Sequence, residues 1–102
     1  MPRTANRSRQ KTPVKLAGKL LEIRLKLDES QNGILIRFGI QDDYDRGYVS
    51  KWERGLLEPP LYVLCFYADA ANVFLEAIVR DELDLPDKLP AKSKSMGVSP
   101  SE

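Results

Sequence analysis

Residues 48–55 read YVSKWERG and predict a short helix that stops at Gly55, because glycine readily adopts the left-handed conformation at a helix C-terminus. Val49 and Trp52 lie three positions apart and give this helix one apolar side. Its other side is polar and mostly basic. An apolar back and a basic front are typical of a recognition helix in a DNA groove. An ordinary amphipathic surface helix is the alternative that these eight residues leave open.

The charge of the chain is unevenly distributed. Its 102 residues are enough for one domain with a single modest core, and the net charge is only +1. Residues 1–26 carry eight basic side chains and one acidic side chain, a net charge of +7. The remaining residues carry eight basic and 14 acidic side chains, a net charge of −6. This asymmetry suggests a polyanionic partner, with a solvated, disordered leader as the alternative for residues 1–11.

The residue types exclude several classes of protein. The single Cys65 cannot form an internal disulfide and lies in an apolar run, so we expect a buried, unreactive thiol in a reducing compartment. The chain has no histidine, which removes Ser-His-Asp and Cys-His catalysis and histidine-based zinc sites. No apolar run approaches the roughly 18 residues of a membrane span. We therefore expect a cytoplasmic protein that is not an enzyme and has no cofactor, metal, small-molecule ligand or membrane partner.

Hydrophobic spacing predicts about five short helices and no convincing strand. The first helix is expected over residues 14–27. The second begins at the N-cap Ser30 and ends at Gly39, and Asp45 is the best cap for the third. A fourth helix follows Pro60, and a short fifth comes after Asn72. The inward positions expected for the last two are Leu61, Leu64, Tyr67, Ala68, Ala71, Leu75, Ile78 and Val79.

These landmarks, taken in order, resemble the phage-repressor (Cro/CI or XRE-type) helix-turn-helix family. Ser30-Gln31 opens the second helix, Gly39 closes it, residues 49–55 read VSKWERG, and Pro59 precedes the fourth helix. The resemblance runs from about residue 16 to residue 79. It implies an all-α, lambda-repressor-like bundle of about five short helices over residues 13–84. A flexible basic arm (residues 1–12) would precede this domain, and a flexible polar tail (residues 85–102) would follow it.

The resemblance also implies a sequence-specific, repressor-like regulator of transcription. Its recognition helix, about residues 46–54, would lie in the major groove of double-stranded DNA. Arg46 and Lys51 fall where family members face base edges, and both side chains can donate to guanine. Gln31, at the start of the second helix, is placed to bond a phosphate oxygen. Tyr48 and Ser50 could contact bases or phosphates, with packing as the alternative for Tyr48. The full set of expected DNA contacts is Gln31, Arg46, Gly47, Tyr48, Ser50, Lys51 and Arg54.

A structural ion pair is expected between the first and third predicted helices. Arg24 and Glu53 match family positions that form such a pair, partly shielded from water. Removing one partner would leave the other charge unpaired. We therefore assign both residues to holding the recognition helix and not to contacting DNA.

Two features depart from the family pattern. Residues 41–45 insert about four extra positions between the second and third helices. Asp42, Asp43 and Asp45 would then lie near phosphates and oppose binding, or the loop points away. Leu35 also replaces the small residue that is usual at the helix crossing. The register of Arg46 and its neighbours is therefore open by a residue or two.

The apolar residues exceed what one small core needs. Val63, Cys65 and Phe66 surround the inward set of the fourth helix. A second copy of the chain would cover such a surface, and we expect a homodimer. The alternative is that the tail folds back over it through Leu83, Leu85 and Leu89. Two other functions stay open: an antitoxin-type protein that binds a cognate toxin and autoregulates, and a protein-docking module that does not bind DNA.

Overall fold

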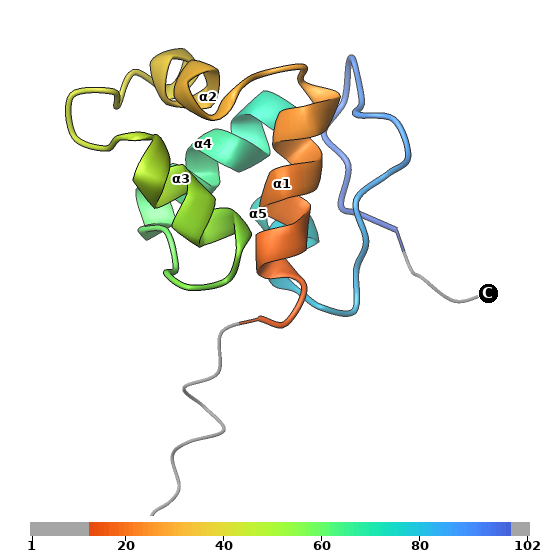
Figure 1. Ribbon diagram of the computed structural model, residues 1–102. Helices are drawn as coiled ribbons and strands as arrows, with labels where there is room; N and C mark the ends of the chain where they lie inside the picture. The colour runs from red at the N-terminus through yellow and green to blue at the C-terminus, as the bar shows by residue number, and fades with distance from the viewer. Residues whose placement is uncertain (1–12, 99–102) are drawn as a thin grey trace, which may run out of the picture.

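Five helices make up the regular structure of residues 13–98, the part of the chain that the computed structural model describes. These residues contain no strand and only two isolated β-bridges, so the predicted all-helical fold is confirmed. The predicted arm, residues 1–12, lies outside the described residues. The helices are α1 (Leu16–Lys26), α2 (Gln31–Phe38), α3 (Arg46–Glu53), α4 (Leu61–Ala71) and α5 (Leu75–Val79), arranged as in Figure 1.

The ends of α2 and α3 are fixed by the residues that the sequence singles out. Ser30 Oγ accepts a hydrogen bond of 2.8 Å from the Gly33 N–H at the start of α2. Gly39 ends that helix in the left-handed conformation, with a φ of 73°. Asp45 Oδ1 accepts a hydrogen bond of 2.9 Å from the Gly47 N–H and caps α3. Each cap satisfies a backbone group that the helix leaves free.

One hydrophobic core lies between α1, α3 and α4 and extends to α2 and α5. Val49 and Trp52 are almost fully buried there, as their spacing predicts. Burying a large apolar side chain contributes roughly 1.5–3 kcal/mol, so these two residues fix the back of α3 to the bundle. The buried apolar residues are Leu16, Leu20, Ile23, Ile34, Leu35, Ile40, Val49, Trp52, Val63, Leu64, Tyr67, Ala68, Ala71, Val73, Ala77, Ile78 and Leu85.

Helix α4 buries Leu64, Tyr67, Ala68 and Ala71, as their spacing predicts, and departs from the prediction at three other positions. Leu61, expected to face inward, is 64% exposed, and Cys65, expected to be buried, is exposed. Val63, expected among the surplus apolar residues, is buried. The buried positions of α4 recur at 63 and 64, at 67 and 68, and at 71, which is one helical face. Leu61 and Cys65 fall outside that face.

The predicted flexible tail is wrong for residues 85–98, which are ordered and packed on the domain. We call these residues the C-terminal segment; Figure 1 shows it beside α1. Leu85 is only 6% exposed. Backbone hydrogen bonds join the Phe74 N–H to the Ser95 carbonyl (2.8 Å) and link Asp84 with Val98 in both directions (2.7 Å each). The domain therefore extends beyond residue 84, and residues 99–102 lie outside the described residues.

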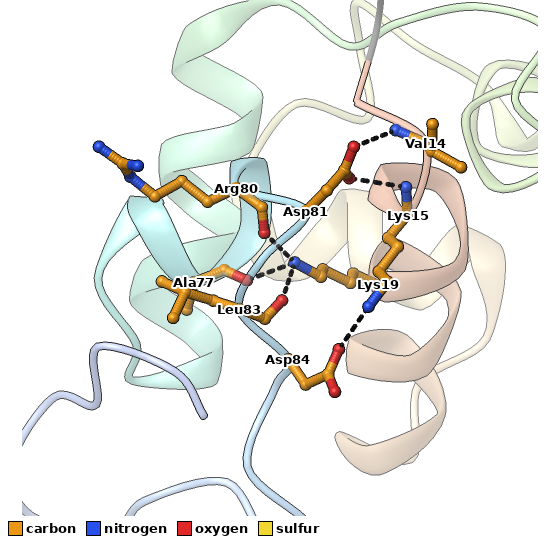
Figure 2. Close-up of polar contacts among 8 residues, drawn as sticks. All are labelled: Val14, Lys15, Lys19, Ala77, Arg80, Asp81, Leu83 and Asp84. Carbon is orange, nitrogen blue, oxygen red and sulfur yellow. Dashed lines mark hydrogen bonds and ion pairs between the residues drawn. The ribbon is translucent and has the colours of Figure 1, made fainter. Parts of the chain in front are cut away.

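A buried lysine fastens α1 to the end of α5. Lys19 is 4% exposed, and its Nζ donates to the carbonyls of Ala77 (2.8 Å), Arg80 (2.8 Å) and Leu83 (2.6 Å), as Figure 2 shows. Its three donors thereby satisfy one carbonyl within the five-residue helix α5, the carbonyl of its C-cap Arg80, and one carbonyl in the turn that follows. Burial lowers the pKa of Lys19, and the nearby carboxylate of Asp81 opposes that effect.

The same junction caps the start of α1. The Asp81 carboxylate accepts hydrogen bonds of 2.9 Å from the N–H groups of both Val14 and Lys15. These bonds lower the pKa of Asp81. The Lys15 ammonium pairs with Asp84 at 3.0 Å. Figure 2 shows the two helices capping each other, with a cation from α1 and a carboxylate from the turn after α5.

Candidate nucleic-acid interface

Three basic side chains at α3 are free on the molecular surface. Arg46, Lys51 and Arg54 are exposed, and no acidic group within residues 13–98 forms an ion pair with any of them. Val49 and Trp52 are buried on the opposite side of the same helix. Helix α3 thus combines a basic front with an apolar back.

The other expected contacts on α3 are more constrained. Gly47 is exposed, but its N–H is used by the Asp45 cap, and a side-chain carbon added there would lie 3.0 Å from the Asp45 oxygen. Tyr48 is 41% exposed, while its ring packs edge-on against Tyr44 with centroids 5.0 Å apart. Ser50 is half-buried. The surface left for a ligand on α3 is therefore formed mainly by its basic side chains.

Gln31 lies at the start of α2, next to the end of α3. Its side-chain Nε2 donates a hydrogen bond of 3.2 Å to Glu53 Oε1, and the residue is half-buried. An amide nitrogen has two donors, so this bond leaves Gln31 one donor for another acceptor. The bond also brings one expected phosphate contact close to the helix that carries the expected base contacts.

Arg24 and Glu53 form the ion pair that the sequence predicts. Arg24 Nε lies 2.6 Å from Glu53 Oε2, and Arg24 Nη2 lies 3.0 Å from Glu53 Oε1. The side chains are 13% and 5% exposed. Arg24 Nη1 also donates to the Glu29 carbonyl (3.0 Å), and the hydrogen bond with Glu53 raises the pKa of Arg24. The pair joins α1 to α3 and, through Gln31, to α2.

Tyr67 of α4 lies beneath this network. Burial raises the pKa of its hydroxyl, and the negative charge of Glu53 raises it further. The hydroxyl therefore stays neutral across the physiological pH range. The charge of the network consequently resides on Arg24 and Glu53.

The loop between α2 and α3 is held at both ends. The buried Ile40 accepts hydrogen bonds through its carbonyl from the N–H groups of Asp43 (3.0 Å) and Tyr44 (3.1 Å). Asp42 and Asp43 are exposed at its tip. Figure 1 shows this loop projecting from the bundle between α2 and α3. The two acidic side chains precede Arg46 by four and three positions in the chain.

Tyr44 anchors that loop, a role that was not predicted from the sequence. Its ring packs edge-on against Tyr48 and Trp52, at centroid distances of 5.0 and 5.3 Å. Its hydroxyl lies 3.3 Å from that of Tyr62 on α4. Tyrosine or tryptophan at positions 44, 48 and 52 recurs every four residues, and that spacing was the available signal.

Other kinds of site find no support in residues 13–98. Across this range no helix is both long enough and apolar enough to cross a membrane. The same residues bring no group of three or more potential metal ligands together. Comparisons with protein-family models, with curated proteins and with solved structures found no match to this chain.

Proposed function

We propose that this protein is a sequence-specific, repressor-like DNA-binding regulator of transcription that places α3 in the major groove of double-stranded DNA. One observation carries the proposal: Arg46, Lys51 and Arg54 are exposed and unpaired within residues 13–98, on a helix fixed from behind by Val49 and Trp52. The resemblance of the sequence to the phage-repressor family supports the same function. Such a regulator would act at the nucleoid, in the cytoplasm.

In this proposal the residues of α2 and α3 make two kinds of contact with DNA, to base edges and to phosphates. Arg46 and Lys51 reach base edges, where their donors match the acceptors of guanine. Arg54 and Gln31 contact phosphates, which fixes the position of α3 without reading the sequence. The bond between Gln31 and Glu53 keeps the phosphate contact in register with α3.

A second candidate is a protein-docking module that does not bind DNA. The observation that favours it is the exposed pair Asp42 and Asp43 in the loop before α3. Negative charge close to phosphates opposes the counterion release that drives DNA binding. An antitoxin-type protein would combine both activities, since it binds a toxin as well as its own operator. A partner protein that stays bound to the Arg46→Ala and Lys51→Ala variants favours either of these candidates.

The decisive experiment selects bound duplexes from a random pool at two salt concentrations. We expect one enriched sequence, and we expect Arg46→Ala and Lys51→Ala to lower the affinity for it by roughly 5- to 150-fold each. Lys92→Ala, at an exposed lysine of the C-terminal segment, is the matched control and should change the affinity little. Enrichment of no sequence, with binding that vanishes steeply as salt rises, would overturn the proposal.

A further inference from the structure

The loop between α2 and α3 is attached near both of its ends to side chains of α4. Before its start, the ring of Phe38 stacks on the ring of Phe66, with centroids 5.5 Å apart. Near its end, the hydroxyl of Tyr62 donates a hydrogen bond of 3.3 Å to the hydroxyl oxygen of Tyr44. The rings of Tyr62 and Phe66 pack edge-on, with centroids 5.9 Å apart. We call these four residues the aromatic bridge.

The aromatic bridge sets the separation between the two ends of the loop. Tyr62 and Phe66 lie four positions apart on α4, and the Cβ atoms of such a pair are about 5–6 Å apart. Between Phe38 and Tyr44 only Ile40 is buried, so the loop makes few contacts of its own with the core. One turn of α4 thereby holds α2 and α3 together across the extra residues of the loop.

Tyr44 transmits this constraint to α3. Its ring packs edge-on against Tyr48 in the first turn of α3 and against Trp52 in the last turn, at centroid distances of 5.0 and 5.3 Å. Edge-on aromatic pairs have a preferred geometry, so the position of Tyr44 and the orientation of α3 are linked. A shift of Tyr44 consequently moves the helix that carries Arg46 and Lys51.

We infer that Tyr62 is a positioning residue for DNA recognition, which holds Tyr44 and through it sets the orientation of α3 in the major groove. This inference rests on the proposed function. Tyr62 lies on α4 and is not among the residues expected to contact DNA. Its loss should weaken specific binding more than non-specific binding, because base edges are read in register whereas phosphate contacts carry no sequence information.

Binding to two duplexes tests the positioning role. Fluorescence anisotropy gives the affinity for the duplex enriched in the selection and for a scrambled duplex. Tyr62→Ala should lower the ratio of the two affinities by roughly fivefold, the contribution of one weakened base contact. Tyr62→Phe keeps the ring that packs on Phe66 and should restore part of the ratio. Leu61→Ala, at the neighbouring exposed residue of α4, is the matched control and should leave the ratio unchanged.

Hydrogen exchange of the free protein gives a second readout that does not involve DNA. The amides of Asp43 and Tyr44 donate to the Ile40 carbonyl, at 3.0 and 3.1 Å, and therefore report on the loop. Tyr62→Ala should speed their exchange by roughly two- to twelvefold, the contribution of one hydrogen bond. The buried Ile23 of α1 reports on the rest of the core, and its amide should change less.

The two readouts separate a failure of this inference from a failure of the proposed function. Unchanged exchange at Asp43 and Tyr44 overturns the inference, whether or not the protein binds DNA. Faster exchange at these amides with an unchanged affinity ratio also overturns it, because the loop then moves without effect on recognition. If the selection enriches no duplex, the proposed function fails and the role of Tyr62 in recognition fails with it.

Discussion

The guanidinium of Arg24 donates two hydrogen bonds, of 2.6 and 3.0 Å, to the carboxylate of Glu53 and thereby joins the last turn of α1 to the end of α3. Both side chains are largely buried, at 13% and 5% exposure. The orientation of α3 thus depends on a contact with a helix that lies outside the proposed DNA surface.

Replacing Arg24 by methionine should destabilise the fold by about 3 kcal/mol, because Glu53 then keeps a buried charge with no cation beside it. Urea denaturation measures the change. Arg80→Met is the control, since the pair between Arg80 and Glu82 is 58% and 66% exposed. Such an exposed pair contributes less than about 1 kcal/mol. Equal effects of the two substitutions would contradict the structural role of Arg24.

Lys19→Met should also cost about 3 kcal/mol, because the carbonyls of Ala77, Arg80 and Leu83 lose their shared donor in a buried site. Urea denaturation again gives the free energy, and hydrogen exchange should show faster exchange of the Asp84 and Val98 amides. Lys15→Met is the comparison, because that lysine is 44% exposed and its pair with Asp84 should contribute little. Unchanged hydrogen exchange of the Asp84 amide would contradict the role of Lys19 in joining α1 to the end of α5.

Asp81 should make the free energy of unfolding depend on pH in the acid range. Its pKa in the folded state lies below the ordinary value of 3.8 because the N–H groups of Lys15 and Val14 bond its carboxylate. The stabilisation is therefore fully present well above pH 3.8 and is lost as the pH falls through the lower folded-state pKa. Wild type and Asp81→Asn should differ in unfolding free energy at pH 6 and converge towards pH 2. Asp87→Asn, at an exposed aspartate, is the control and should leave the unfolding free energy unchanged at both pH values.

Neutralising the tip of the loop between α2 and α3 should strengthen non-specific DNA binding. The combined substitution Asp42→Asn and Asp43→Asn removes two exposed negative charges from the loop that precedes Arg46. We expect affinity for a scrambled duplex to rise roughly two- to tenfold at low salt, and the gain to shrink as salt screens the charges. Fluorescence anisotropy measures both effects, and Glu76→Gln on α5 is the control. No gain at any salt concentration would mean that the loop points away from the duplex.

The helices and their ends could be predicted because their signals are local. Ser30, Gly39 and Asp45 each act through a neighbour a few positions away, and the structure confirms all three. The burial of Val49 and Trp52 follows from their spacing on α3. The pair of Arg24 with Glu53 spans 29 positions; only the resemblance to a family suggested it, and the structure contains it.

The long-range polar contacts were not predicted from the sequence. Lys19 follows Leu16 and precedes Leu20 and Ile23 on the inward face of α1, so its position already pointed to the core, but its acceptors lie far along the chain. The C-terminal segment has no hydrophobic period because backbone pairing and a few anchors such as Leu85 hold it. On α4 the spacing correctly predicted Leu64, Tyr67, Ala68 and Ala71, and it misjudged Leu61 and Cys65 because apolar residues occupy every side of the first turns of that helix.

The three hydrogen bonds of Lys19 have a consequence for the order in which the chain folds during its synthesis on the ribosome. Its acceptors follow it by 58 to 64 positions, and synthesis at roughly 5–20 residues per second makes them about 3 to 13 s later. Through that interval the Lys19 side chain has none of these acceptors, so α1 cannot make its contact with the end of α5. Completion of this domain is therefore timed by the emergence of the turn after α5.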